Sequence, residues 1–232
     1  MAALRTELSK RNEEQFVPGS DLTAQGALLL CAAGVSAVID WWAVAKSAEK
    51  IERIFKPATL ALLIGTAAVL HPLDHRVRIW LIVGLILGLM GDVFLMGPRE
   101  NFVGGLASFL AGHLAYIVAF SLEWTSSKLF VIGLAIAAAG LATVGRSIVK
   151  SVSISEPRLV LPVVAYTTAI SFMVATGFAT GSRWALLGSL VFVLSDGMLA
   201  FNRFVKPFPN ARLFVIVSYH LGQAGIVLSL IH

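Results

Sequence analysis

Apolar segments of membrane-spanning length follow one another along most of the chain, separated by short polar connections. A transmembrane helix needs about 20 predominantly apolar residues, and only helices and closed barrels satisfy their backbone hydrogen bonds in lipid. About eight such segments are expected, near residues 22–44, 55–70, 78–96, 102–122, 128–145, 159–179, 183–202 and 211–231. This pattern predicts an all-α, polytopic membrane protein built as a compact bundle of about eight transmembrane helices.

The composition agrees with this class, because 57% of the residues are hydrophobic and 13% are charged, whereas soluble domains carry about 25% charged residues. The first 21 residues are polar and lack the apolar core of a signal peptide. We therefore expect a polar tail over 1–21 and a single transmembrane domain over 22–232. The lone cysteine, Cys31, excludes an internal disulfide. The net charge of +5 comes without a basic stripe interleaved with aromatic residues, so no nucleic-acid partner is expected.

Lysine and arginine are distributed unevenly between the two sides of the predicted bundle. The connections after the first, third, fifth and seventh segments carry eleven of them, and the other side carries seven. Cytoplasmic loops are enriched in these residues, so both termini are expected to face away from the cytoplasm. The host is expected to be a cell inner membrane or an endoplasmic-reticulum-type membrane.

Two aspartates interrupt the apolar segments in matching contexts. Asp92 and Asp196 each follow a small residue and each precede a leucine by three positions. An ionisable residue near the centre of a transmembrane helix costs about 2.5–3.5 kcal/mol on insertion scales, and such residues usually mark function. Both aspartates lie toward the same side of the predicted bundle, which makes them the candidate catalytic pair.

Other polar side chains gather on that side of the bundle or near its midplane. They predict a cavity that opens on one face and ends at mid-depth. The candidates for binding substrate or tuning the aspartates are Lys56, His113, Tyr116, Tyr166, Asn202, Arg203 and Gln223. Asp40 also closes the first segment on this side, while Asn202 and Arg203 suit an anionic headgroup at the interface.

The third and fourth segments resemble the seventh and eighth. Each pair contains the aspartate motif, a connection with proline, and then a segment in which histidine and tyrosine lie close together, at His113 and Tyr116 or at Tyr219 and His220. A parallel repeat of four helices would produce this pattern. Chance similarity between apolar sequences of low diversity explains it equally well.

Two carboxyl groups in a low-dielectric cavity cannot both ionise cheaply, so one is expected to keep its proton beside the other's negative charge. That arrangement suits acid catalysis through an oxocarbenium-like cation. Two alternatives remain open. The aspartates can be separate structural residues, or they can carry protons or cations in a membrane transporter or lipid-handling protein.

Motifs of other hydrolases are absent from the sequence. It has no Gly-x-Ser-x-Gly elbow and no His-Glu-x-x-His, and its five histidines lack metal-ligand spacing. The Gly-x-Gly-Asp and Tyr-Asp motifs of intramembrane aspartyl proteases are also missing. No metal site and no cofactor are therefore expected.

Six stretches together resemble the YhhN-type lysoplasmalogenase family of integral membrane proteins, and they occur in the order of that family. They are FKPATL (55–60), GLMGDVFLM (88–96), FVGGLASFLAGHLAY (102–116), LPVVAY (161–166), GSLVFVLSDGMLAFNRF (188–204) and SYHLGQ (218–223). The resemblance implies about eight spans, no required metal and a lysophospholipid substrate. The implied reaction is hydrolysis of the vinyl-ether bond of a lysoplasmalogen, giving a fatty aldehyde and glycerophosphocholine or glycerophosphoethanolamine.

Overall fold

The computed structural model of the chain describes residues 22–96 and 101–231, and the expected tail over 1–21 lies outside them. The described part is helical throughout. In chain order the elements are α2 (Ala24–Ala45), α3 (Glu49–Val69), α4 (His75–Met96), α5 (Phe102–Leu122), α6 (Ser127–Gly140), the π-helix η1 (Leu141–Gly145), α7 (Arg146–Ser155), the 3-10 turn η2 (Pro157–Leu159), α8 (Val160–Ala179), α9 (Arg183–Phe204) and α10 (Ala211–Leu228).

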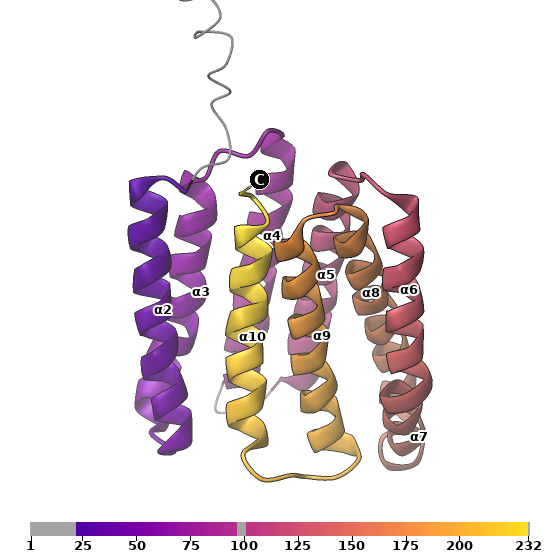
Figure 1. Cartoon of the computed structure of the whole chain (residues 1–232). Helices are drawn as coiled ribbons and strands as arrows, with labels where there is room; N and C mark the ends of the chain where they lie inside the picture. Colours follow the sequence, from indigo (N-terminus) through magenta and orange to yellow (C-terminus); the bar gives the residue numbers. More distant parts are fainter. Residues whose placement is uncertain (1–21, 97–100, 232) are drawn as a thin grey trace, which may run out of the picture.

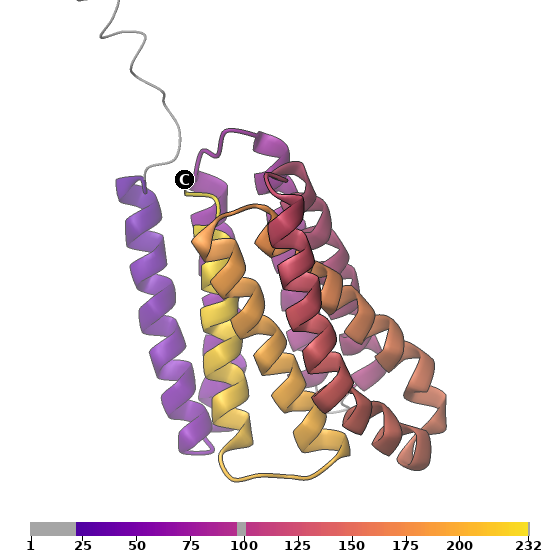
Figure 2. The same cartoon turned by 45° about the vertical axis from the view of Figure 1, so that its right-hand side comes forward.

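The long helices stand side by side as one bundle (Figure 1). The principal neighbours are α2 with α3, α4 with α5, α6 with α8, and α9 with α10. When the bundle is turned by 45°, α6 comes forward and α7 continues it at the lower right (Figure 2). The outer surface is apolar at many positions, such as Leu28 and Leu161, which are 73% and 78% exposed. This surface fits contact with lipid and confirms the predicted all-α, polytopic membrane class.

Seven of the described helical stretches are long and apolar enough to cross a membrane, and α3 is not among them. Its first two turns carry the charged residues Glu49, Lys50, Glu52, Arg53 and Lys56. It nevertheless has 21 residues and packs along α2 and α4 in the bundle. The expected second span is therefore present as a helix of the bundle, but its first turns are charged.

The fifth expected segment, 128–145, ends too early. Helical structure continues from α6 through η1 into α7, so that Ser127–Ser155 forms a stretch of 29 residues. Arg146 and Lys150 carry charge but do not break a helix, and the first residue that does is Pro157. A polar extension of a span can remain helical because its backbone bonds are satisfied within the helix.

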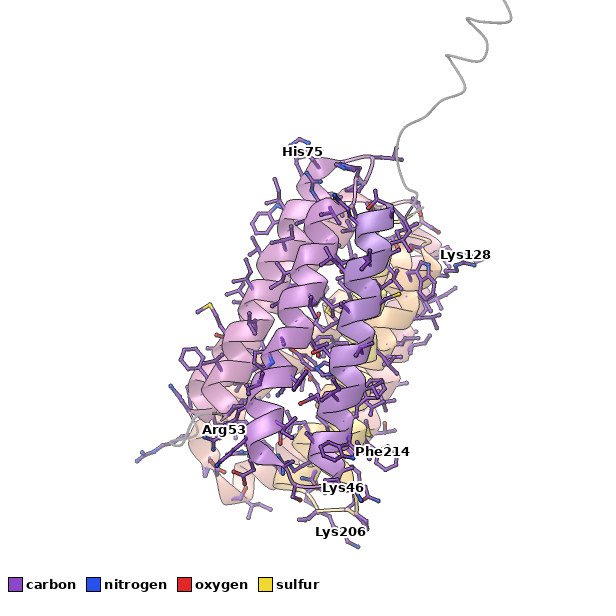
Figure 3. The ribbon with its side chains drawn as sticks, turned by 90° about the vertical axis from the view of Figure 1, so that its left-hand side faces the viewer. Lys46, Arg53, His75, Lys128, Lys206 and Phe214 are labelled. Carbon is purple, nitrogen blue, oxygen red and sulfur yellow. The ribbon has the colours of Figure 1, made fainter. Side chains whose placement is uncertain are left out.

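The two ends of the bundle differ in how many lysines and arginines their connections carry. Lys46, Arg53 and Lys206 lie at one end, which we call the basic end, while His75 and Lys128 lie at the other (Figure 3). The basic end holds the connections α2–α3 and α9–α10. The helices α3, α8 and α10 therefore begin there, and α2, α4 and α9 finish there.

Glycine allows the backbones of α9 and α10 to approach each other closely. A Cβ atom added at Gly188 would lie 2.6 Å from the backbone nitrogen of Ile226, so only glycine fits there without a shift of the helices. Small residues commonly permit such contacts between transmembrane helices. Helices α4 and α5 also approach closely, since a Cβ at Gly112 would lie 3.2 Å from the carbonyl oxygen of Gly84.

Candidate active site

A largely apolar cavity of about 1080 Å³ runs between the helices, and both membrane aspartates line it. Asp92 lies about 6 Å from the end of α4, and Asp196 lies about 12 Å from the end of α9, at 1.5 Å per residue. Half of a typical hydrocarbon core is about 15 Å thick. Both carboxyl groups therefore lie within the membrane-spanning length of their helices, toward the basic end.

Asp92 is held by two donors from other helices. Its Oδ1 lies 2.7 Å from Nζ of Lys56, and the hydroxyl of Tyr219 donates to its Oδ2 at 2.9 Å. The Lys56 ammonium also lies 5.7 Å from the centre of the Tyr219 ring. The Asp92 side chain is only 1% exposed. A buried carboxylate needs a paired charge and hydrogen bonds, and Asp92 has both.

Asp196 has a different environment, because no lysine or arginine of the described residues pairs with it as Lys56 pairs with Asp92. The hydroxyl of Tyr166 donates to its Oδ2, and Nε2 of His113 lies 3.7 Å from the same oxygen. The His113 ring packs edge-on against both Tyr166 and Phe192, with centroids 5.0 Å apart in each case. Asp196 keeps 14% of its side chain exposed, so it is the more open of the two carboxyl groups.

Each aspartate has one partner from a distant part of the chain. Asp92 on α4 bonds to Tyr219 on α10, while Asp196 on α9 lies beside His113 on α5. Each also has a partner closer in sequence, Lys56 for Asp92 and Tyr166 for Asp196.

Some of the predicted residues lie behind the cavity wall. The hydroxyl of Tyr116 donates to Oε1 of Gln223 at 2.7 Å, which joins α5 to α10. Nε1 of Trp41 donates to Nδ1 of His220 at 3.1 Å, which joins α2 to α10. These buried pairs do not line the cavity. They can fix the position of α10, and with it Tyr219, but they do not reach the space where a ligand would lie.

The mouth of the cavity at the basic end carries both signs of charge. Asn202, Arg203, Glu52 and Arg212 all line it. The Arg203 guanidinium lies 3.9 Å from the centre of the Phe102 ring, and the Asn202 side chain accepts a hydrogen bond from the backbone of Phe208. Arg212 pairs with Glu52 at 2.8 Å. This ion pair was not predicted, because its members lie 160 positions apart.

Tyr219 was also missed as a site residue, although it was noted beside His220. The available signal was its spacing of four residues from Gln223, which places both side chains on one face of a helix. Asp40 lies elsewhere: it is fully buried on α2, and neither carboxyl oxygen has a hydrogen-bond partner within the described residues. Among those residues there is also no cluster of three or more His, Cys, Asp or Glu that could hold a metal.

The fold and this site define an α-helical, multi-pass integral membrane protein with two differently partnered carboxyl groups facing an apolar cavity at bilayer depth. The sequence model of the YhhN family matches residues 51–230. The chain belongs to this family. The matched region contains both aspartates, together with Lys56, Tyr166 and Tyr219, whereas Asp40 and Trp41 precede it.

Several characterised proteins are similar in sequence. Lysoplasmalogenase TMEM86B of Homo sapiens is 34% identical over 145 residues, which is 62% of this chain and 60% of the human protein. Its Sus scrofa counterpart is 37% identical over the same shares of the two chains. A lysoplasmalogenase of Mycobacterium tuberculosis is 31% identical over 179 residues, covering 74% of this chain and 67% of that protein. The chain thus spans about 60% of the length of the mammalian relatives, and no solved structure matches it.

Proposed function

We propose that this protein is a lysoplasmalogenase, which hydrolyses the vinyl-ether bond of alkenyl-glycerophosphocholine or alkenyl-glycerophosphoethanolamine. The products would be a fatty aldehyde and glycerophosphocholine or glycerophosphoethanolamine. The observation that carries the proposal is the pair of unlike carboxyl sites on one apolar cavity. Membership of the YhhN family and similarity to proteins named lysoplasmalogenase support it.

The contacts of the two aspartates suggest their separate roles. Asp92 faces an ammonium and accepts a phenol hydrogen bond, and both contacts favour a negative carboxylate. Asp196 has one phenol donor and the His113 ring beside it, but no lysine or arginine pairs with it among the described residues, which favours a neutral carboxylic acid. We assign Asp196 as the general acid and Asp92 as the anion that stabilises the developing cation.

In the reaction, Asp196 would donate its proton to the β-carbon of the vinyl ether, leaving a positive charge shared by the α-carbon and the ether oxygen. The Asp92 carboxylate would stabilise this cation and accept a proton from the water that adds to the α-carbon. The hemiacetal would then collapse, its hydroxyl proton passing to the departing glycerol oxygen. One water is consumed, and the proton gained by Asp92 must return to Asp196 before the next turnover.

The neighbouring residues would position these groups. Tyr166 and His113 would orient Asp196, while Lys56 and Tyr219 would hold Asp92 as an anion. The lysophospholipid headgroup would lie at the basic end, near Asn202. Asn202 lies about 9 Å along α9 from Asp196 at 1.5 Å per residue, which leaves room for a glycerol unit between the reacting bond and the phosphate.

The proposal can be tested with purified protein in liposomes. We expect an alkenyl lysophospholipid to release aldehyde and the ester-linked analogue to release no fatty acid. Fatty acid from the ester would identify a lysophospholipase and exclude the oxocarbenium mechanism. If folded protein formed neither product, proton-driven uptake into vesicles would be the next assay, since it would support the transporter alternative.

We also propose that the basic end faces the cytoplasm, so that both termini lie on the other side of an inner or endoplasmic-reticulum-type membrane. The lysine and arginine distribution supports this orientation. A reporter that is active only outside the cytoplasm should therefore be active when fused after residue 232. A fusion at that position whose reporter is active only in the cytoplasm would reverse the assignment.

A further inference from the structure

The apolar part of the cavity extends away from the two aspartates, along the side of the bundle. Ile136, Leu141 and Val144 from α6 and η1 line one wall, and Leu190 and Leu194 from α9 line the other. Helix α8 contributes Val174 behind them and packs against both α6 and α9. The walls of this branch, which we call the α6–α9 groove, carry no charged side chain among these residues.

Several side chains that line the α6–α9 groove are partly exposed. Ile136 is 45% exposed, Val144 is 44% exposed and Leu194 is 57% exposed. All three lie on helical stretches that are long and apolar enough to cross a membrane, where the medium outside the bundle is lipid hydrocarbon. An opening of the groove on this side would face the bilayer, and the same cavity holds Asp196. Figure 2 shows α6 and α9 on the side turned toward the viewer.

Glycine keeps part of this space empty. Gly140 lines the cavity from the end of α6, and a Cβ atom added there would meet no other atom within 4 Å. Glycine inside a helix costs about 0.5–1 kcal/mol relative to alanine. Nothing packs against Gly140 to require the absence of a side chain, so its effect is to leave room in the groove.

We propose that the α6–α9 groove binds one hydrocarbon chain, that of the lysophospholipid, and admits it sideways from the bilayer to Asp196. The inference rests on the proposed function for the identity of the amphiphile. Hydrocarbon is the only material that surrounds an apolar opening at this depth. The polar groups near Asn202 at the basic end match the other end of such a molecule. Entry from the bilayer also spares the chain any passage through water, where each methylene costs about 0.8 kcal/mol.

Filling the empty space tests this proposal. In Gly140→Phe the added Cβ would meet no atom within 4 Å, and the ring would occupy the groove. We expect turnover of a long-chain alkenyl lysophospholipid to fall by at least about tenfold, the factor that corresponds to 1.4 kcal/mol of lost binding. A short-chain vinyl ether that does not extend into the groove should be hydrolysed at the wild-type rate. Gly140→Phe that hydrolyses both substrates like the wild type would overturn the proposal.

The chain supplies a matched control. Gly34 is an exposed glycine on α2 whose added Cβ would also meet nothing within 4 Å, and it does not line the cavity. Gly34→Phe should leave both rates unchanged. If Gly34→Phe also lost activity on the long-chain substrate, the bulky residue would be disturbing the bundle in general. The result with Gly140→Phe would then no longer support chain binding in the groove.

Crosslinking tests whether the groove binds the hydrocarbon chain independently of whether the protein hydrolyses the lipid. A lysophospholipid with a photoreactive group in its chain should label 136–144 and 190–194 even if no aldehyde is ever formed. Labelling of these residues in a protein without hydrolase activity would keep the groove and discard the reaction. Labelling confined to other helices would discard the groove, whatever the protein's activity.

Discussion

Replacing Asp196 by asparagine is expected to lower the turnover of an alkenyl lysophospholipid by about 100-fold or more, since general acid catalysis contributes about 10²–10⁴-fold. Asparagine has nearly the same shape but cannot give up a proton to the vinyl carbon. The Tyr166 hydroxyl can still donate to the amide oxygen, so folding and lipid binding should persist. The measurement is the initial rate of aldehyde release, with lysophospholipid binding and size-exclusion behaviour checked in parallel.

Asp92→Asn is expected to be inactive for a different reason, because the amide cannot carry the negative charge that stabilises the cation. Asp74→Asn is the matched control. Asp74 is an aspartate outside the spans, in the loop before α4, where its carboxylate accepts hydrogen bonds from Arg76. Its replacement should leave the rate unchanged. Substantial aldehyde release by Asp196→Asn would remove that residue from the chemistry and leave the acid to be sought elsewhere.

Lys56→Met is expected to destabilise the folded protein by about 3–5 kcal/mol, the usual cost of breaking a buried ion pair. Asp92 would lose the ammonium 2.7 Å away while its side chain remains only 1% exposed. Asp40, which is fully buried and close enough to Lys56 to interact with its charge, would lose the same cation. The free energy of unfolding, measured by denaturant titration in detergent micelles, would report this loss.

The double variant Lys56→Met/Asp92→Leu separates loss of the pair from loss of lysine packing. A buried ion pair replaced by apolar residues is often neutral or stabilising, so the double variant should recover most of the stability while remaining inactive. Lys128→Met, at an exposed position at the start of α6, is the control and should have little effect. A double variant as unstable as Lys56→Met would show that the methylene stem of Lys56, rather than its charge, supports the bundle.

The class of protein could be predicted from the sequence because it depends on local quantities. Hydrocarbon-length apolar segments specify helices that cross a bilayer, whatever their neighbours are. Hydropathy predicts helix bounds less well where charged and apolar residues mix. The second predicted span is α3, whose first turns are charged. The fifth predicted span ends at residue 145, but the helix continues to Ser155.

The end of the bundle toward which the polar residues gather also followed from the sequence. Position along a helix gives depth, so Asp92, Asp196, Lys56 and Tyr166 could be expected at similar levels. Depth does not give the angle around each helix axis. His113, Tyr116 and Gln223 have suitable depth, yet Tyr116 and Gln223 bond to each other away from the cavity.

The sequence by itself determined that this protein spans a membrane, that two aspartates lie within its spans, and that the chain resembles the YhhN family. Only the tertiary structure decided which partners those aspartates have. Lys56 and Tyr219 contact Asp92, while Tyr166 and His113 contact Asp196. The partners lie 30 to 127 positions from their aspartate in the sequence. The physical reason is that hydropathy is a property of each segment, whereas a hydrogen bond between helices depends on how the segments pack and rotate against one another.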